Sequence, residues 1–180
     1  MNDSLTDGFV LLRRYQDCDS DEIYHAVRES IAELSPWLEW CDESYSLEDA
    51  EEFIRQQSEW WENGEVFNFA ITDYQTHTYC GGCLLNNINR GDRFGNLSYW
   101  VRSSRVGKGV ATAAVKLVAN YGFEYLGLNR VEIVVAVENA GSIRVAKKVG
   151  ATQEGTLRSR IQIRDRVYDA LMFSLIPSDL

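Results

Sequence analysis

A short basic segment with two glycines, set between a strand-like and a helix-like run, limits what this chain can fold into more than any other feature. The segment, residues 101–112, reads VRSSRVGKGVAT and follows a strand-like run over residues 96–101. The residues after it have the apolar spacing of a helix, with apolar positions at Val110, Ala114, Val118, Tyr121 and Tyr125. The chain therefore places a loop where a strand ends and a helix begins.

That loop has the features of an anion site. A helix N-terminus exposes unpaired backbone N–H groups and the positive end of the helix dipole. Gly107 and Gly109 let a ligand come close to this backbone, and Arg102, Arg105 and Lys108 add charge of the same sign. We therefore predict a site for a phosphate or pyrophosphate. The alternative is a plain strand–turn–helix join with a solvated basic loop.

Length and charge narrow the class of protein. With 180 residues, of which 45% are hydrophobic and 25% charged, the chain is expected to form one globular domain over residues 1–180. Its net charge of −9 argues against direct binding to nucleic acid. The charge is uneven, because eleven acidic residues and one base, Arg28, lie between Asp21 and Glu52, a net −10. We interpret this acidic part either as solvated helix faces or as a field that attracts a cationic acceptor.

Neither a membrane span nor a secretion signal is visible. There is no run of eighteen apolar residues, and the N-terminus, Met-Asn-Asp-Ser, lacks a basic region and an apolar core, so we expect a cytoplasmic protein with no membrane partner. Cys80 and Cys83 form a lone C-x-x-C. A zinc site would need a second pair or histidines, and the chain has only two histidines. We therefore predict buried thiols and no metal.

The order of the predicted elements indicates an α+β fold. Turn-rich joins between the middle strands favour antiparallel hairpins, and the strand–helix–strand unit around the basic loop implies a parallel pair with a right-handed crossover. We predict a mixed, mostly antiparallel sheet with one central parallel strand pair, flanked by helices. The expected strands cover residues 9–15, 66–72, 79–88, 94–101, 130–136, 151–163 and 167–175. The other expected helices begin at an Asp19–Ser20 cap, at a Ser46-x-x-Asp49 capping box with an end near Gly64, and at an Asn139 cap.

Three classes of anion loop compete for residues 101–112. A Walker loop is excluded, because Lys108 is followed by Gly109 and no earlier glycine has the required spacing. A dinucleotide-binding fingerprint is a weak alternative. Gly107-x-Gly109 fits it and Glu138 lies where the ribose-binding acid would be, but Thr112 takes the place of the third glycine.

The third class rests on a resemblance to a known family. Residues 106–111, VGKGVA, resemble the [RQ]-x-x-G-x-[GA] acetyl-coenzyme A loop of the GNAT acetyltransferases, and residues 138–150, ENAGSIRVAKKVG, resemble their second conserved block. Together with Trp-Leu-x-Trp at residues 37–40, their order and spacing resemble the ribosomal-protein N-terminal (Rim-type) branch, over nearly the whole chain. The resemblance implies transfer of acetyl from acetyl-CoA to a primary amine by direct attack. A protein N-terminal α-amine is the favoured acceptor; an acetyltransferase of a small-molecule amine and a non-catalytic acyl-CoA-binding module are the alternatives.

The resemblance also implies roles for individual residues. Backbone N–H groups of the glycine loop would hold the pyrophosphate, and the Val101 N–H would stabilise the oxyanion. Asn139 and Ser142 match the motif beside the pantetheine and the sulfur, and Ser142 is the candidate acid for the leaving thiolate; helix capping and a plain first-turn serine are the alternatives. The residues expected to bind acetyl-CoA are Tyr99, Trp100, Val101, Arg105, Gly107, Lys108, Gly109, Val110, Ala111, Thr112, Asn139 and Ser142. Trp37 and Trp40 are expected to bind the acceptor, with core packing as the alternative.

The sequence departs from the family pattern at three positions. Val106 stands where Arg or Gln is usual, and Ala151 where Phe is common. Ile161 occupies a position where many Rim-type members have a glutamate near the acceptor. This last change removes the natural candidate for a general base, so we expect an acceptor amine of low pKa, such as a ribosomal-protein N-terminus. A homodimer is left open.

Overall fold

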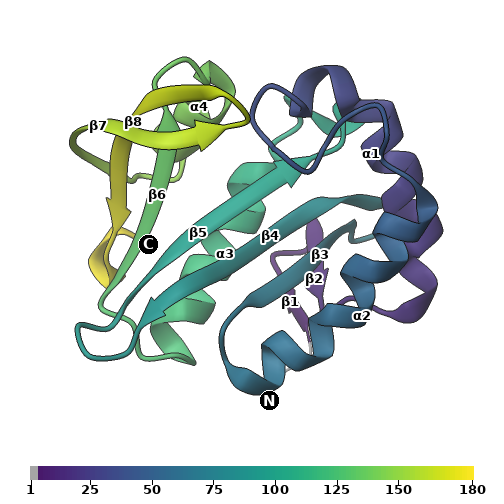
Figure 1. The fold of residues 1–180 in the computed structure, drawn as a ribbon. Coiled ribbons are helices and arrows are strands. Elements are labelled where there is room, and N and C mark those ends of the chain that lie inside the picture. Colours follow the sequence, from purple (N-terminus) through teal and green to yellow (C-terminus); the bar gives the residue numbers. More distant parts are fainter. Residues whose placement is uncertain (1–3) are drawn as a thin grey trace.

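The computed structural model describes residues 4–180 and shows one mixed sheet with helices on both faces (Figure 1). The strand order across the sheet is β1-β2-β3-β4-β5-β6-β8-β7. The strands are β1 (Ser4–Thr6), β2 (Val10–Arg13), β3 (Phe67–Asp73), β4 (Tyr79–Asn89), β5 (Phe94–Val101), β6 (Arg130–Ala136), β7 (Thr152–Ile163) and β8 (Arg166–Leu175). The helices are α1 (Ser20–Leu34), α2 (Leu47–Asn63), α3 (Val110–Glu124) and α4 (Ala140–Lys148), with short 3-10 turns η1 (Asp17–Asp19), η2 (Ser103–Arg105) and η3 (Pro177–Asp179).

The parallel strand pair opens the middle of the sheet. Neighbouring strands are antiparallel except β5 and β6, which are joined by α3, and this confirms the predicted α+β fold with one central parallel pair. β5 and β6 pair only through Phe94–Asn96 and Arg130–Glu132. Beyond these residues the two strands diverge, as the upper part of Figure 1 shows. The divergence leaves a gap in the sheet that side chains and neighbouring helices line.

Two hydrophobic cores fix the helices on the two faces. α3 and α4 pack in the larger core, where Val115, Val118 and Phe173 are fully buried. α1 and α2 pack in the second core around Val27 and Tyr79. In Figure 1, α1 and α2 lie in front of the strands and α3 lies behind them. The open end of the sheet is therefore reached by helices from both faces.

Local capping signals set several element ends, as predicted. Ser46 Oγ accepts the Asp49 N–H, and the Asp49 carboxylate accepts the Ser46 N–H. α2 ends at Gly64, which has a left-handed φ of 65°. Asn139 Oδ1 accepts the N–H of Ser142 in the first turn of α4. These three predictions are confirmed because each depends on residues close together in the chain.

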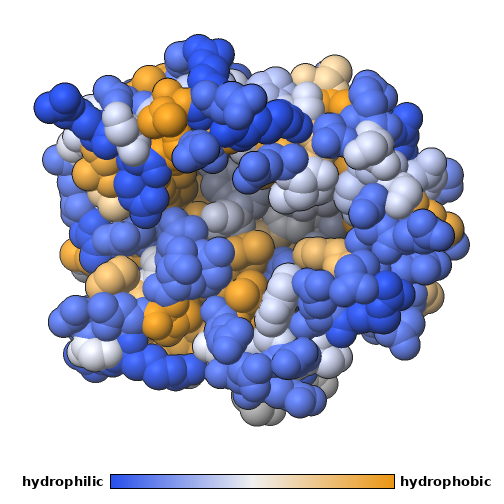
Figure 2. Space-filling view, in the orientation of Figure 1, coloured by the Kyte–Doolittle hydropathy of each residue, from blue (hydrophilic) through white to orange (hydrophobic). Residues whose placement is uncertain are grey.

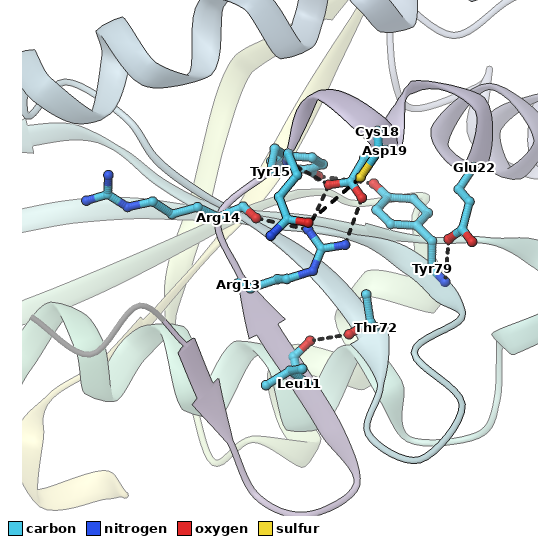
Figure 3. Close-up of polar contacts among 10 residues, drawn as sticks. Leu11, Arg13, Arg14, Tyr15, Cys18, Asp19, Glu22, Thr72 and Tyr79 are labelled. Atoms are coloured by element: carbon cyan, nitrogen blue, oxygen red, sulfur yellow. Dashed lines mark hydrogen bonds and ion pairs between the residues drawn. The ribbon is translucent and has the colours of Figure 1, made fainter.

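The N-terminal region differs from the prediction. The strand expected over residues 9–15 is the shorter β2, with β1 before it. Asp19 precedes α1, but its side chain does not cap the helix. Instead it accepts both arms of the Arg13 guanidinium at 2.7 Å and the Gln16 N–H at 2.8 Å (Figure 3). Asp19 is only 4% exposed, and a carboxylate so buried is costly unless it is paired. The Asp19 carboxylate therefore pairs with Arg13 and does not cap α1.

The exposure of individual side chains tests the predictions for the two cysteines and for Tyr125. Cys80 and Cys83 are free and buried, as predicted. Tyr125 was expected on the apolar stripe of α3, but it is 51% exposed because the helix ends at Glu124.

Within residues 4–180, no helix is both long and apolar enough to cross a membrane, and no group of three or more His, Cys, Asp or Glu is placed to hold a metal ion. The targeting prediction concerned the first four residues, of which 1–3 lie outside the described part.

Candidate functional site

A cleft of about 520 Å³ lies where β5 and β6 diverge. Figure 2 shows the corresponding hollow in the middle of this face of the molecule. One group of lining residues comes from β5, β6, the glycine loop, the first turn of α3, and α4. The other comes from the end of α1, the segment after it, and β7. The cleft brings together nearly all the predicted site residues: Trp37, Tyr99, Trp100, Val101, Arg105, Gly107, Gly109, Val110, Ala111, Thr112, Asn139 and Ser142. Ile161 also lines it.

The glycine loop opens α3 as predicted. Gly107 and Gly109 have left-handed φ values of 78° and 89°, and Gly109 is the residue before the helix. No side chain caps this helix start, so its first N–H groups have no side-chain acceptor. A Cβ on Gly109 would meet only a ring carbon of Phe9 at 3.9 Å, and one on Gly107 would meet nothing within 4 Å. The backbone conformation therefore calls for glycine here, while the space beside it is left open.

The three loop cations are less free than the sequence suggested. Arg105 pairs with Asp73 at 3.3 Å. Arg102 pairs with Glu29 and also donates to the Tyr79 carbonyl at 3.1 Å. Lys108 is exposed and makes no ion pair within residues 4–180. Most of the predicted excess positive charge is thus offset by carboxylates, and the helix N-terminus provides much of what is left to attract an anion.

Helix α1 braces the loop just before the glycines. The Ser103 N–H donates to Ser30 Oγ at 2.9 Å, and the Ser104 N–H donates to Glu29 at 2.8 Å. Ser103 Oγ donates to Glu33 at 2.7 Å. The hydrogen bond from the Arg102 guanidinium, together with that from Ser104, lowers the pKa of Glu29 to about 2. Sequence reasoning missed this brace, because its partners are 70 to 75 positions apart and no local pattern announces them.

Asn139, Ser142 and Tyr99 meet at the start of α4. Tyr99 Oη donates to the Ser142 carbonyl at 3.1 Å, which links β5 to α4 across the cleft. Burial raises the pKa of the Tyr99 hydroxyl, so it stays a donor. Among the described residues, the Ser142 hydroxyl has no hydrogen-bond partner. Ser142 lines the cleft, and its hydroxyl is therefore available to hydrogen-bond to a ligand there.

The opposite wall is apolar. Trp37, Leu38, Ile161 and Ile163 line it, and the Trp37 ring lies 6.2 Å from that of Tyr168.

Trp40 is not among the residues that line the cleft. It is 47% exposed and packs edge-on against Trp100 at 6.0 Å. Behind Trp100, the hydroxyls of Tyr15 and Tyr79 contact each other at 3.1 Å (Figure 3). Trp40 thus contacts Trp100 from outside the cleft, while Trp37 belongs to the cleft lining itself.

Sequence comparison finds a family and several relatives. A family model described as an acetyltransferase (GNAT) domain matches residues 10–152. YdaF of Bacillus subtilis (strain 168), provisionally named a ribosomal N-acetyltransferase, is 26% identical over 174 residues, covering 93% of this chain and 91% of that protein. A spermidine N(1)-acetyltransferase of Vibrio cholerae is 26% identical over 140 residues, covering 77% and 79%.

Solved structures share the fold over nearly the whole chain. A protein from Vibrio cholerae, provisionally named a ribosomal-protein-serine acetyltransferase, superposes with a TM-score of 0.86 at 27% identity and covers 98% of both chains. The microcin C7 self-immunity acetyltransferase MccE, solved with acetyl-CoA and AMP, has a TM-score of 0.86 at 23% identity, covering 95% of this chain and 93% of that one.

Proposed function

The chain belongs to the GNAT acetyltransferase family and is an acetyl-CoA-dependent N-acetyltransferase, and from this premise we propose that it acetylates the α-amine of a protein N-terminus. A ribosomal protein is the leading acceptor, because two of the similar proteins carry names that refer to ribosomal proteins. The apolar wall of Trp37, Leu38, Ile161 and Ile163, where we place the acceptor, supports an α-amine independently of those names.

The observation that carries the proposal is the scarcity of carboxylates in the cleft. Ile161 and Ile163 stand in the wall, and Glu33 is the one carboxylate among the described lining residues. Glu33 already accepts a hydrogen bond from Ser103. The attacking amine must be neutral, and an α-amine with a pKa near 7.7–8.0 is about a tenth or more neutral at pH 7. A lysine at about 10.4 would need help worth roughly three pKa units, or near 4 kcal/mol.

In the proposed reaction, the loop N–H groups from Gly107 to Thr112 bind the pyrophosphate, and the β5 edge at Tyr99–Val101 binds the pantetheine arm like an added strand. The Val101 N–H stabilises the negative charge that develops on the thioester oxygen. The amine nitrogen forms a bond to the carbonyl carbon and loses a proton to water.

As the carbon–sulfur bond breaks, the thiolate takes the Ser142 hydroxyl proton, which water then replaces. Ser142 suits this role because its hydroxyl is unpaired among the described residues, while Asn139 fixes its backbone.

A small-molecule amine is the second candidate acceptor. It is favoured by the similarity to a spermidine acetyltransferase over 77% of this chain, and by the acidic charge between Asp21 and Glu52, which would attract a polycation. Several of these acids are occupied in the structure: Glu29 pairs with Arg102, and Glu43 with Arg28. The non-catalytic binding module considered as an alternative does not agree with membership of an N-acetyltransferase family.

An acceptor screen tests the proposal. Release of free CoA is measured with peptides that carry a free N-terminus and no lysine, with the same peptides acetylated at the N-terminus and given one internal lysine, and with spermidine. We expect turnover of the first set at neutral pH and little of the second. Preferred turnover of internal lysine or of spermidine would overturn the proposed acceptor.

The proposed reaction belongs in the cytoplasm, where acetyl-CoA and newly made ribosomal proteins meet. A single domain over residues 1–180, a homodimer and the absence of nucleic-acid binding stay predictions.

A further inference from the structure

Arg164 joins two parts of the chain that together form the apolar wall of the cleft: the β7–β8 hairpin and the segment after α1. It is placed in the tight turn between β7 and β8, with a left-handed φ of 51°. Its Nη1 donates to the Ser35 carbonyl at 2.7 Å, and its Nη2 donates to the carbonyls of Cys41 at 3.1 Å and Glu39 at 3.5 Å. All three carbonyls belong to the segment that directly follows α1. Figure 1 shows this segment beside the tip of the β7–β8 hairpin.

These contacts compensate for a feature that α1 lacks. The last carbonyls of a helix have no partner within the helix and carry the negative end of its dipole. The last turn of α1 contains no basic residue. A guanidinium can donate several hydrogen bonds in a fixed planar arrangement, which suits a cluster of carbonyls. Arg164 therefore supplies from a distant hairpin the positive charge that the helix end does not provide itself.

The same contacts connect the two segments that make up the apolar wall of the cleft. Trp37 and Leu38 lie on the segment that Arg164 holds, while Ile161 and Ile163 lie on the strand that leads to Arg164. Cys41 is fully buried and anchors one end of the segment. The part from residue 35 to 40 is attached to the hairpin by the hydrogen bonds of Arg164 and by the packing of Trp37 against Tyr168.

We propose that Arg164 is a positioning residue for the acceptor: it fixes the segment that carries Trp37 against the hairpin that carries Ile161, sets the shape of the apolar wall that they form together, and so selects which amines reach the acetyl group. The inference rests on the proposed function only in placing the amine at this end of the cleft. It does not depend on which amine is used. Because the glycine loop is held separately, by Glu29, Ser30 and Asp73, the binding of acetyl-CoA is independent of Arg164.

Arg166 provides a matched control two residues away. It is also an exposed arginine of the same hairpin, but it pairs with Glu138 at 3.0 Å and lies over the Tyr168 ring at 4.6 Å. Both of these partners lie in the C-terminal part of the chain, and neither belongs to residues 35–41. Loss of Arg166 therefore removes a similar charge and a similar number of polar contacts without releasing the Trp37 segment.

The test compares Arg164→Ala, Arg164→Lys and Arg166→Ala, using whichever amine the unchanged protein acetylates best. In Arg164→Ala, we expect kcat/KM for the amine to fall about tenfold or more, because charge-assisted hydrogen bonds to three carbonyls are lost. The Kd for acetyl-CoA, measured by calorimetry, should change less than about twofold. Arg164→Lys should recover only part of the loss, because one ammonium group cannot reproduce the planar fork.

A readout that needs no acceptor completes the test. Amide hydrogen exchange over residues 35–40 should accelerate in Arg164→Ala and stay unchanged in Arg166→Ala. An unchanged amine KM and kcat with unchanged exchange would overturn the proposal, as would equal losses for the amine and for acetyl-CoA. If the unchanged protein prefers spermidine, the proposed function fails, while the comparison of the arginine variants still decides the role of Arg164.

Discussion

Replacing Gly81 by alanine should damage the centre of the sheet more than any other single methyl addition at a glycine. Gly81 lies in β4 opposite Val101 of β5, with a φ of 146° that side chains rarely adopt. A Cβ there would lie 2.1 Å from the Trp100 carbonyl oxygen and 2.9 Å from the Val101 Cα. Both obstacles are backbone atoms, so no side chain can rotate away to make room.

The magnitude follows from two costs. Holding a residue in a disfavoured backbone region costs about 1–3 kcal/mol, and forcing extra volume into a packed site costs about 1–3 kcal/mol more. A loss of about 2–6 kcal/mol is therefore expected, against a total stability of about 5–15 kcal/mol for a typical domain. The relief of the clash would push β5 away from β4 at Val101, so the folded fraction should also lose activity.

Chemical denaturation followed by tryptophan fluorescence measures the stability loss, with Gly155→Ala as the control. Gly155 lies in strand β7 without a left-handed φ, and its Cβ would meet nothing within 4 Å. We expect this control to stay within about 1 kcal/mol of the unchanged protein. If Gly81→Ala also unfolds within about 1 kcal/mol of the unchanged protein, the clash argument is wrong.

Three further substitutions or conditions test the site and its supports. Gly109→Val should weaken acetyl-CoA binding at least tenfold by calorimetry, whereas Gly127→Val, equally left-handed at 66° but outside the cleft lining, should bind normally. Ser142→Ala should lower kcat with little change in the KM for acetyl-CoA, because the proton is needed only as the thiolate leaves; an unchanged kcat would exclude this acid. The pKa values of Glu29 and Glu154 are lowered to about 2 by Arg102 and Arg130, respectively. Their stabilising contribution should be complete above about pH 4.5 and disappear as the pH falls toward 2, and a stability flat over that range by denaturation would contradict it.

Local rules account for the parts of the fold that the sequence predicted well. The capping box at Ser46, the left-handed Gly64 and the Asn139 cap each involve residues within a few positions of one another. The local sequence alone therefore locates them. The parallel pair followed from the loop between β5 and α3, since parallel strands need a crossover. The prediction that Asp19 caps α1 was wrong because its buried carboxylate pairs with Arg13, six positions earlier, instead of with the helix N-terminus.

The connections across the cleft had no such local signal. Trp37 and Trp40 are four positions apart, and only the path of the chain after α1 decides which one lines the cleft. Glu29, the ion-pair partner of Arg102, and the partners of Arg164 lie more than 70 residues away in the chain. Hydrogen bonds of this kind depend on the completed packing of helices on the sheet, so residue types and spacing do not reveal them.

The position of α1 beside both ends of the cleft has a consequence for how such enzymes diverge. Its middle turns, with Glu29 and Ser30, hold the loop that every acetyl-CoA-dependent member must keep working. In the segment after its last turn, Trp37 and Leu38 line the part of the cleft where we propose that the acceptor binds, and among the described residues none of 35–40 hydrogen-bonds to that loop. Transplanting residues 35–40 from a relative, together with its own hairpin turn, should therefore exchange acceptor preference while leaving donor use intact. Substrate range can then change within two short stretches of chain, without renewed selection on the residues that bind acetyl-CoA.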